Sequence, residues 1–266
     1  MLFFMFSILL FIFGAVVGSF LGVVIDRLPK GKTIVKGRSH CDYCKHTLSG
    51  FDLVPVISFL ALRGKCRYCH SSIGWSTFLI ESITGLLFVI TFLFEQSSFE
   101  SQLFSIAFFT SLLYYLYIVS SLIAIFFIDL EHGIIPNKIV YPAVVVSLIY
   151  LAAFHATSLP QYLLSSLAAF FFFFLLYIFT KKKGMGLGDV KFAFLMGLIL
   201  GFPGIVIALY IAFLTGAFIA CMLVLWRKKK FGGGTVPFGP FLVGGTLVSL
   251  FAGEILWVKL MQIFFR

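Results

Sequence analysis

The chain alternates between long apolar stretches and short polar connections. A helix rises about 1.5 Å per residue, so about 20 apolar residues cross a hydrocarbon core of about 30 Å. The pattern therefore predicts an all-α, polytopic integral membrane protein with about eight transmembrane helices, one of them short. The predicted segments are residues 1–25, 75–94, 103–128, 139–156, 161–180, 190–200, 205–226 and 236–259.

Composition supports a lipid environment. The chain is 61% hydrophobic and 11% charged, with a mean hydropathy of +1.10, and a soluble domain of this length would be unable to bury so much apolar surface. The net charge of +10 suggests nucleic acid at first. However, the basic residues stand in short blocks between apolar stretches, which is typical of membrane topology. We therefore expect the lipid bilayer, and no nucleic acid, as a partner.

The basic residues sort to one side of the predicted topology. Nine lie in the long polar segment 27–74 and nine more at the ends of later segments, whereas only Lys259 and Arg266 fall on the opposite side. Loops rich in Lys and Arg face the cytoplasm. The first segment has no basic residue ahead of it, unlike a secretory signal. We expect a retained first helix with its N-terminus outside and segment 27–74 in the cytoplasm.

Two carboxylates are predicted at the same depth. Glycines at alternate positions, Gly184, Gly186 and Gly188, lead directly to Asp189 at the start of an apolar segment, where a helix dipole favours negative charge. Asp129 ends the third segment, which the topology brings to the same membrane surface. Carboxylates beside hydrocarbon indicate function. Two of them in contact would share a proton and hydrolyse an amide through an activated water.

Simpler explanations of these charges stay open. Asp129 and Glu131 are also what an interfacial helix end would carry, and Asp189 is also a suitable helix N-cap. Lys191 is close enough in sequence to form a local ion pair with Asp189. Nothing in the spacing alone shows that the third and sixth segments touch.

Four cysteines form two pairs with metal-ligand spacing. Cys41 and Cys44 form the first pair, and Cys66 and Cys69 form the second. Two such pairs predict a tetrahedral Zn²⁺ site of structural type, which would fold a polar segment too small for its own core. Disulfides are the alternative, but a cytoplasmic segment is kept reducing. Flanking histidines, which offer substitute ligands, are His40, His46 and His70.

Other positions suggest helix packing and site shaping. Gly14, Gly18 and Gly22, spaced four apart, predict a face for close approach of another helix. Glu81 lies about 9 Å into the second segment, where it would line a substrate path, meet a basic group or form an interhelical hydrogen bond. Near the start of the last segment, irregular backbone would bind a substrate strand or simply begin a helix. The residues concerned are Pro237, Gly239 and Pro240.

Five blocks in this order resemble the type IV prepilin peptidase family, whose members are membrane aspartyl proteases with a Gly-x-Gly-Asp motif. The resemblance implies that Asp129 and Asp189 are the catalytic pair. It also implies cleavage of a short basic leader, after a glycine, at the cytoplasmic face of the bacterial inner membrane. The blocks are residues 18–29, the cysteine segment, 129–137, 184–191 and 236–240.

The same resemblance implies a second activity. Family members methylate the new N-terminal residue with S-adenosylmethionine, and the cysteine segment is associated with that activity. Gly22 departs from the family pattern, because bifunctional members often carry Asn at this position. Methyltransferase activity is therefore an open alternative for this chain.

The sequence thus predicts one polytopic peptidase domain over residues 1–266, with a zinc-binding loop at 27–74 and core helices at 75–266. Its substrates would be prepilins or pseudopilins of a type IV pilus, competence or type II secretion system. The site-shaping residues would be Gly186, Gly188, Lys191, Glu131, Glu81, Pro237, Gly239 and Pro240. Rival hypotheses are a transporter and a non-catalytic zinc-loop scaffold, and the oligomeric state is left open.

Overall fold

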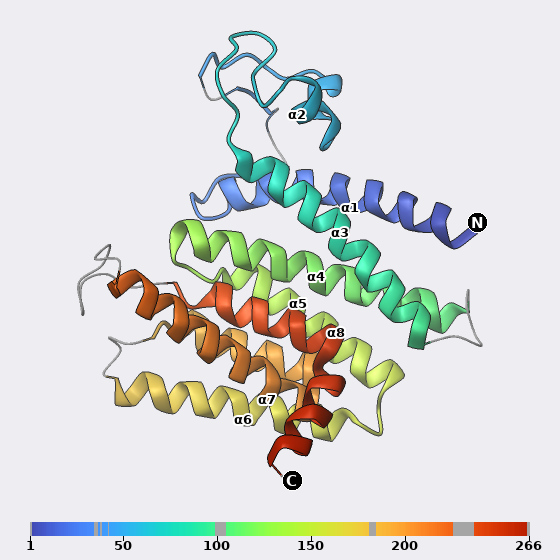
Figure 1. Cartoon of the computed structure of the whole chain (residues 1–266), viewed down its shortest axis with the longest axis vertical. Coiled ribbons are helices and arrows are strands. Elements are labelled where there is room, and N and C mark those ends of the chain that lie inside the picture. The colour runs from blue at the N-terminus through green and yellow to red at the C-terminus, as the bar shows by residue number, and fades with distance from the viewer. Residues whose placement is uncertain are drawn as a thin grey trace. The chain divides into compact units, whose positions relative to one another are not determined.

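The computed structural model describes residues 2–34, 37, 39–41, 43–98, 105–180, 185–225 and 237–264. The basic runs 181–183 and 227–230, Gly184, Glu100 and residue 236 lie outside this described part. Within it the chain is almost entirely helical (Figure 1). The helices are α1 (Leu2–Arg27), η1 (Gly50–Leu53), α2 (Ile57–Ala61), α3 (Trp75–Ser98), α4 (Ile106–His132), α5 (Asn137–Phe154), α6 (Leu159–Phe179), α7 (Leu187–Leu225) and α8 (Gly239–Phe264).

Seven of the helices in the described ranges are long and apolar enough to cross a membrane. The predicted fold class is confirmed. The predicted segment 190–200 and the described part of segment 205–226 lie in one helix, α7, which is broken by non-helical backbone. Gly201 has φ +60° and ψ −171°, and Phe202 is extended. A positive φ is readily adopted only by glycine, so this residue allows the chain to turn.

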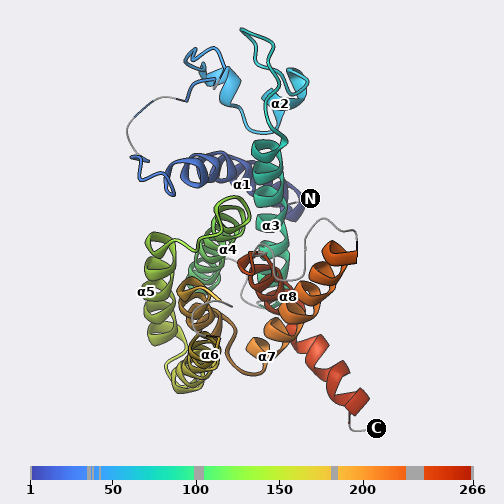
Figure 2. The same ribbon diagram turned by 90° about the vertical axis from the view of Figure 1, so that its left-hand side faces the viewer.

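The two arms of α7 run in opposite directions. On the first arm the Phe194 ring lies 6.4 Å from that of Phe170 on α6, and on the second arm the Phe213 ring lies 6.1 Å from that of Phe173. Phe194 precedes the bend and Phe213 follows it, yet both contact neighbouring positions on α6. The first arm therefore runs antiparallel to α6, and the second arm runs parallel to it. The folding back is visible in Figure 2. The first arm, at about 1.5 Å per residue, is too short to cross a full bilayer as a straight helix.

The structure corrects the predicted end of the third segment. That segment was expected to stop at Ile128, before the first charge, but α4 continues to His132 and contains Asp129. The helix ends where Gly133, with φ +66°, donates its N–H to the carbonyl oxygen of Asp129 at 2.9 Å. This is a glycine-terminated helix end, which satisfies one of the last carbonyl groups.

The chain divides into two compact units, Met1–Ala124 and Ile125–Arg266. In the first unit α1 packs closely on α3. A Cβ at Gly18 would lie 2.7 Å from Cα of Glu81, so the two backbones approach as the glycine spacing predicted, although Gly22 has nothing near it. In the second unit α6 and α8 both pack on α7, and the Ser249 hydroxyl donates to the carbonyl oxygen of Gly204 at 2.7 Å.

Candidate active site and metal centre

Asp129 lies inside α4, and its residue surface is only 5% exposed. Its Oδ2 accepts a hydrogen bond from the backbone N–H of Gly239 at 2.9 Å. Gly239 is the first residue of α8, so this N–H is one of the helix donors that have no partner within the helix. The carboxylate therefore caps a helix 110 residues further along the chain, and the positive end of that helix favours its charge.

Asp189 lies in the first turn of α7. Its Oδ2 accepts the backbone N–H of Gly186 at 3.1 Å, three residues earlier. An acidic side chain reaching back to the N-cap N–H is half of a capping box. The sequence left two interpretations of Asp189, as a helix-start residue and as a functional carboxylate. The two are compatible, because the cap uses only one oxygen of the carboxylate.

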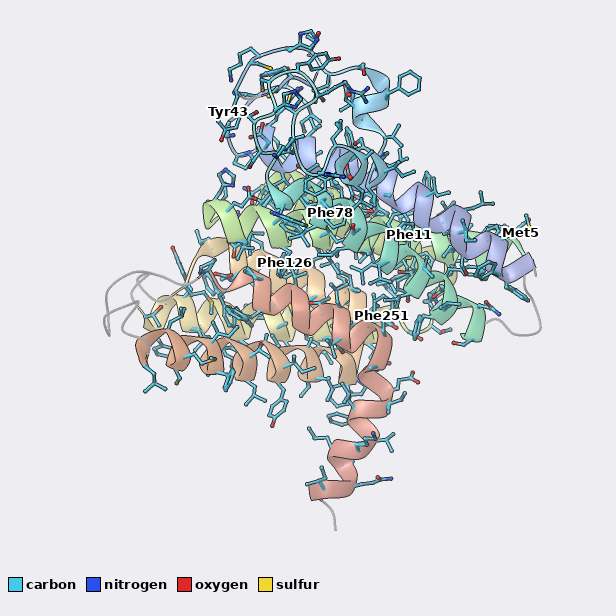
Figure 3. The ribbon with its side chains drawn as sticks, turned by 45° about the horizontal axis from the view of Figure 1, so that its top comes forward. Met5, Phe11, Tyr43, Phe78, Phe126 and Phe251 are labelled. Atoms are coloured by element: carbon cyan, nitrogen blue, oxygen red, sulfur yellow. The ribbon has the colours of Figure 1, made fainter. Side chains whose placement is uncertain are left out.

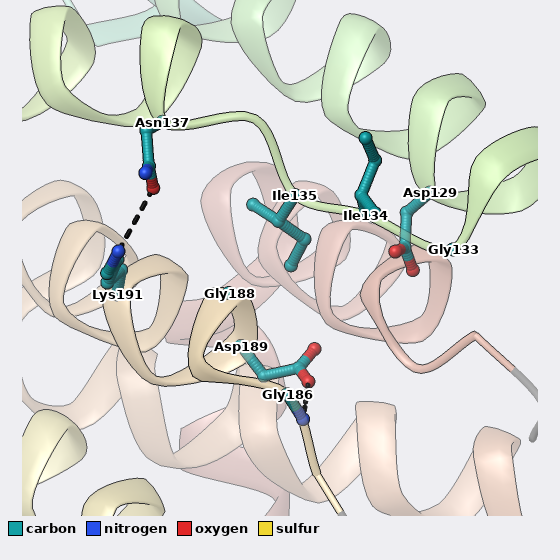
Figure 4. Close-up of a pocket in the computed structure, with 9 residues that line it drawn as sticks. All are labelled: Asp129, Gly133, Ile134, Ile135, Asn137, Gly186, Gly188, Asp189 and Lys191. Atoms are coloured by element: carbon teal, nitrogen blue, oxygen red, sulfur yellow. Dashed lines mark hydrogen bonds between the residues drawn. The ribbon is translucent and has the colours of Figure 1, made fainter. Parts of the chain in front are cut away.

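The two carboxylates line the same pocket (Figure 4). They come from α4 and from the first turn of α7. The pocket has a volume of about 320 Å³, which is large enough for several atoms of a peptide chain. Its other lining residues come from the α4–α5 connection and the start of α7: Gly133, Ile134, Ile135, Asn137, Gly186, Gly188 and Lys191.

The α4–α5 connection packs against the glycine-rich segment. A Cβ at Gly188 would lie 3.0 Å from Cβ of Ile135, so the absence of a side chain lets Ile135 sit directly over the start of α7. In the view of Figure 4, Ile135 lies between Lys191 on the left and Asp129 on the right, with Asp189 below it. This contact fixes the start of α7, and hence Asp189, relative to the end of α4.

Lys191 is held by neutral partners. Its Nζ donates to Oδ1 of Asn137 at 3.2 Å and lies 5.5 Å from the centre of the Tyr141 ring. Among the described residues no ion pair joins it to Asp189, so the local ion pair that the sequence left open is not formed. A cation at the edge of a pocket with two acids contributes positive charge without neutralising either acid directly.

This arrangement suits acid–base chemistry. Two carboxylates that line one pocket and approach each other do not both ionise readily, so one tends to keep a proton. An ionised carboxylate can accept a proton from water, and a protonated one can donate to a carbonyl oxygen. The geometry therefore supports hydrolysis of an amide bond placed between the two.

The four cysteines of the first unit form a compact cluster. One sulfur atom of each lies within 4.8 Å of every other, and the Sγ atoms of Cys41 and Cys69 are 3.8 Å apart. A tetrahedron with Zn–S bonds of about 2.3 Å has edges of about 3.8 Å. The four sulfurs therefore fit a tetrahedral metal ion, and the described cysteines form no disulfide.

Both cysteine pairs use the same backbone turn. The N–H of Cys41 donates to the carbonyl oxygen of His46 at 3.0 Å, and the N–H of Cys66 donates to that of Ser71 at 2.9 Å. A residue with positive φ follows the second cysteine of each pair: Lys45 at 57° and His70 at 56°. Two matching turns present their sulfurs toward one another, which is the construction expected of a paired metal knuckle.

Hydrogen bonds favour the thiolate form that a metal requires. The N–H groups of Cys44 and Tyr43 lower the pKa of the Cys41 thiol to about 6. The Ser71 hydroxyl, 3.0 Å from Sγ of Cys69, lowers the pKa of that thiol. At Cys44 the His46 N–H also favours the thiolate, but burial and the neighbouring thiols of Cys69 and Cys41 raise the pKa to about 11. Metal binding would therefore displace protons from the cluster.

The structure separates the other predicted site residues. Gly186, Gly188 and Lys191 line the pocket, and Gly239 contacts Asp129, whereas Glu131 is exposed and does not line it. Pro237 is partly buried and Pro240 is buried at the start of α8. Glu81 belongs to the first unit, where its Oε2 accepts the N–H of Val56 at 2.7 Å. This backbone partner is none of the three roles predicted for Glu81, which stay predictions.

Sequence reasoning did not single out Ile135, Asn137 or Ser71. Ile135 and Asn137 lie within the block 129–137, but an isoleucine and an asparagine after a helix carry no signal of their own. Their contacts at the start of α7 arise only once α4 and α7 are brought together. Ser71 follows the second cysteine pair directly, and a hydroxyl beside a predicted metal ligand is a signal that could have identified it.

Comparison with known families covers most of the chain. The model of the bacterial peptidase A24 N-terminal domain matches residues 12–94, and the model of the type IV leader peptidase family matches residues 116–221. The first match contains the four cysteines and Glu81. The second contains both aspartates of the pocket.

Individual relatives give the same result. A prepilin leader peptidase/N-methyltransferase of Bacillus subtilis (strain 168) is 30% identical, with 92% of this chain and 94% of the relative covered. The protein of the same name from Aeromonas hydrophila is 28% identical, with 92% and 90% covered. That of Myxococcus xanthus (strain DK1622) is 30% identical, with 83% and 64% covered. No solved structure matches the chain.

Proposed function

The chain belongs to the type IV leader peptidase family, and from this premise we propose that it is a membrane aspartic peptidase for prepilin-like precursors with Asp129 and Asp189 as its catalytic pair. The observation that carries the assignment of residues is the shared pocket, where two helix-capping carboxylates from distant parts of the chain meet. The substrates are prepilins or pseudopilins, and the setting is the bacterial inner membrane.

In the proposed reaction, water attacks the peptide carbonyl directly. The ionised carboxylate accepts a proton from the water while the water oxygen bonds to the carbonyl carbon. The protonated carboxyl donates its proton to the carbonyl oxygen. The tetrahedral intermediate then breaks its C–N bond. The departing amine takes a proton from the carboxyl that had accepted one. The other carboxylate takes back the proton from the former carbonyl oxygen as the C=O bond reforms, which restores the pair. No covalent link to the protein forms.

The helix caps would orient this pair. A backbone N–H holds Oδ2 of Asp129 and another holds Oδ2 of Asp189, so each carboxylate is fixed through one oxygen and keeps the other for the substrate or water. Fixed donors that need not reorganise during the reaction are an effective source of catalysis. Gly186, Gly188 and Lys191 would shape the pocket. Roles for Glu131, Glu81, Pro237 and Pro240 in substrate binding stay predictions.

We assign the pocket and the cysteine segment to the cytoplasmic side, with the N-terminus outside, on the distribution of basic residues. The apolar part of a precursor would lie among the spans and present its leader at that surface. We also infer that residues 1–266 act as one peptidase domain, in which 27–74 is the loop and 75–266 the core helices.

The cysteine cluster would hold a structural Zn²⁺ through Cys41, Cys44, Cys66 and Cys69. The support is the fit of the sulfur spacing to a tetrahedral ion and the matching turns. Four thiolates complete the coordination of the metal, which leaves no position for a catalytic water. The metal would therefore stabilise the loop and take no part in cleavage.

A second activity, N-methylation with S-adenosylmethionine, is proposed from the names of the relatives. The pocket described above provides carboxylates for hydrolysis and no assigned place for that methyl donor, so no catalytic step is routed through it. The rival functions receive less support. A transporter or a non-catalytic scaffold would not explain why two carboxylates share a pocket at the helix ends.

The test is cleavage by the purified full-length protein in detergent. A prepilin-like precursor with a short basic leader is the substrate, and mass spectrometry identifies both products. We expect a single cut that releases the leader. Folded, zinc-loaded protein that leaves every such precursor intact would refute the proposal. Adding labelled S-adenosylmethionine to the same reaction tests methylation separately.

A further inference from the structure

Among the described residues, none covers the outer side of one apolar segment of the first unit. Residues Gly50–Leu53 form η1 and Ile57–Ala61 form α2, and we call residues 50–61 the apolar arm. Three of its large side chains are strongly exposed: Phe51 at 81%, Ile57 at 65% and Leu60 at 60%. Exposed apolar side chains gathered on one short segment indicate an interaction surface.

The opposite side of the apolar arm is anchored to α3. Phe59 is 9% exposed, and its ring lies 5.3 Å from that of Trp75 and 5.0 Å from that of Phe78. Phe78 is labelled in Figure 3, which shows this part of the first unit. The arm is therefore held on the first turn of a membrane-spanning helix.

A hydrogen bond fixes how deep the arm lies. The N–H of Val56 donates to Oε2 of Glu81 at 2.7 Å. Glu81 is six residues after Trp75, so it lies about 9 Å along α3 from its start. A helix of 24 residues is about 36 Å long, against a hydrocarbon core of about 30 Å. The middle of the arm is therefore level with the boundary between headgroups and acyl chains, or slightly inside it.

The backbone of the arm is adapted to that level. Val56 has φ +62°, an unfavourable conformation for a β-branched residue, and its N–H reaches Glu81. The next donors are used internally: Ile57 N–H to Pro55, Ser58 N–H to Val54 and Leu60 N–H to Val56. Unpaired backbone donors are costly beside hydrocarbon. A segment that satisfies them through internal bonds and a carboxylate is suited to lie against lipid.

The acidic side chain of the apolar arm is buried and paired. The Asp52 side chain is 3% exposed and accepts from Nε of Arg67 at 2.6 Å and from the Ser49 hydroxyl at 2.7 Å. The hydrogen bond from Ser49 is the main cause that lowers the pKa of Asp52, and the bond from Arg67 lowers it further. Asp52 is therefore charged, and its charge is paired. Directly after the arm, Arg63 and Lys65 are exposed. Basic residues beside an apolar interfacial segment complement anionic headgroups.

We propose that the apolar arm lies in the membrane interface, with Phe51, Ile57 and Leu60 against phospholipid acyl chains, and that it holds the cysteine segment down on the bilayer. The occupant is lipid because the arm is fixed at bilayer depth by Glu81 and is flanked by exposed cations. This inference does not depend on the peptidase assignment.

The test uses depth-dependent quenching of single tryptophans in the full-length protein. The native Trp75, Trp226 and Trp257 are replaced by Phe, and Phe51→Trp or Leu60→Trp is added. The variants are reconstituted in vesicles of phosphatidylethanolamine and phosphatidylglycerol that contain brominated lipid. Leu86→Trp, at an exposed position within α3, is the lipid-facing control, and Tyr43→Trp, on the first cysteine turn, is the water-facing control. Zinc content verifies the fold.

We expect brominated lipid to quench Phe51→Trp and Leu60→Trp as strongly as Leu86→Trp, while aqueous acrylamide quenches only Tyr43→Trp strongly. The proposal would be overturned if acrylamide quenched the two arm positions as strongly as Tyr43→Trp and brominated lipid had no effect on them. The arm would then lie in water. Protection from both quenchers would also overturn it, because the face would then be covered by protein, such as a second copy or a substrate. Because no cleavage is measured, failure here is distinct from failure of the peptidase proposal.

Discussion

At the scale of single residues, the pocket depends on small contacts that leave no room for added atoms. A Cβ at Gly239 would lie 2.5 Å from Oδ2 of Asp129, so Gly239→Ala must push the carboxylate away. Misplacement of a catalytic group by about 1 Å can cost about 100-fold in rate, and we expect a loss of that order in leader cleavage. Gly244→Ala on the same helix is the control, because a Cβ there meets nothing within 4 Å. Equal rates for the two variants would mean that the Gly239 contact does not matter.

Lys191 offers a second test at this scale. Its bond to Asn137 links the start of α7 to the start of α5, and Asp189 is only two residues away. A hydrogen bond involving a charged group contributes about 1.5–3 kcal/mol, so Lys191→Met should reduce the cleavage rate by about 10-fold or more. Lys138→Met removes a charge one residue from Asn137 without touching the pocket lining. If both variants cleave at the wild-type rate, Lys191 has no positioning role.

At the scale of elements, hydropathy was sufficient to predict the spans but not their ends. The apolar segments and the break before Pro203 could be read directly, because lipid demands long apolar runs and glycine permits the turn. The position of Asp129 inside α4 could not, because a charged residue ordinarily marks a helix end. It is retained in the helix because its side chain turns inward to cap α8, a contact 110 residues away that no local pattern encodes.

The cysteine segment is the element in which the spacing correctly predicted a cluster of four side chains. Two matched turns converge on one cluster, so we expect one zinc per chain by elemental analysis. Cys66→Ser should abolish that zinc and make the segment sensitive to protease, because the metal supplies its folding energy. Cys221→Ser, a free cysteine on α7, should leave one zinc per chain. Zinc retained in full by Cys66→Ser would exclude this cluster as the metal site.

At the scale of the whole molecule, the charge distribution predicts orientation. If each arm of α7 reaches the opposite surface, the described helices make an even number of passes, and we expect both ends of the chain on the outside. Epitope tags after Thr157 and at the C-terminus should be cleaved by protease added to spheroplasts, and a tag within 181–183 should be protected until the membrane is opened. Early cleavage of the tag at 181–183 would place the pocket on the wrong side for cytoplasmic precursors.

The site was harder to predict than the membrane topology. Asp129 and Asp189 were recognisable as costly charges beside hydrocarbon, but their proximity required a fold in which the ends of α4 and α7 meet. The structure brings both into one pocket together with Ile135 and Asn137, which no motif indicated. Sequence patterns indicate whether each segment lies in lipid or in water. They say little about which segments become neighbours.

The measurement that tests the central claim most directly is leader cleavage by Asp129→Asn and Asp189→Asn, assayed separately in folded, zinc-loaded protein. Asparagine keeps the size and the cap acceptor but neither accepts a proton from water nor donates one as an acid. The account predicts that each substitution alone abolishes cleavage, since both carboxylates act in the same step. Cleavage at a wild-type rate by either variant would contradict it.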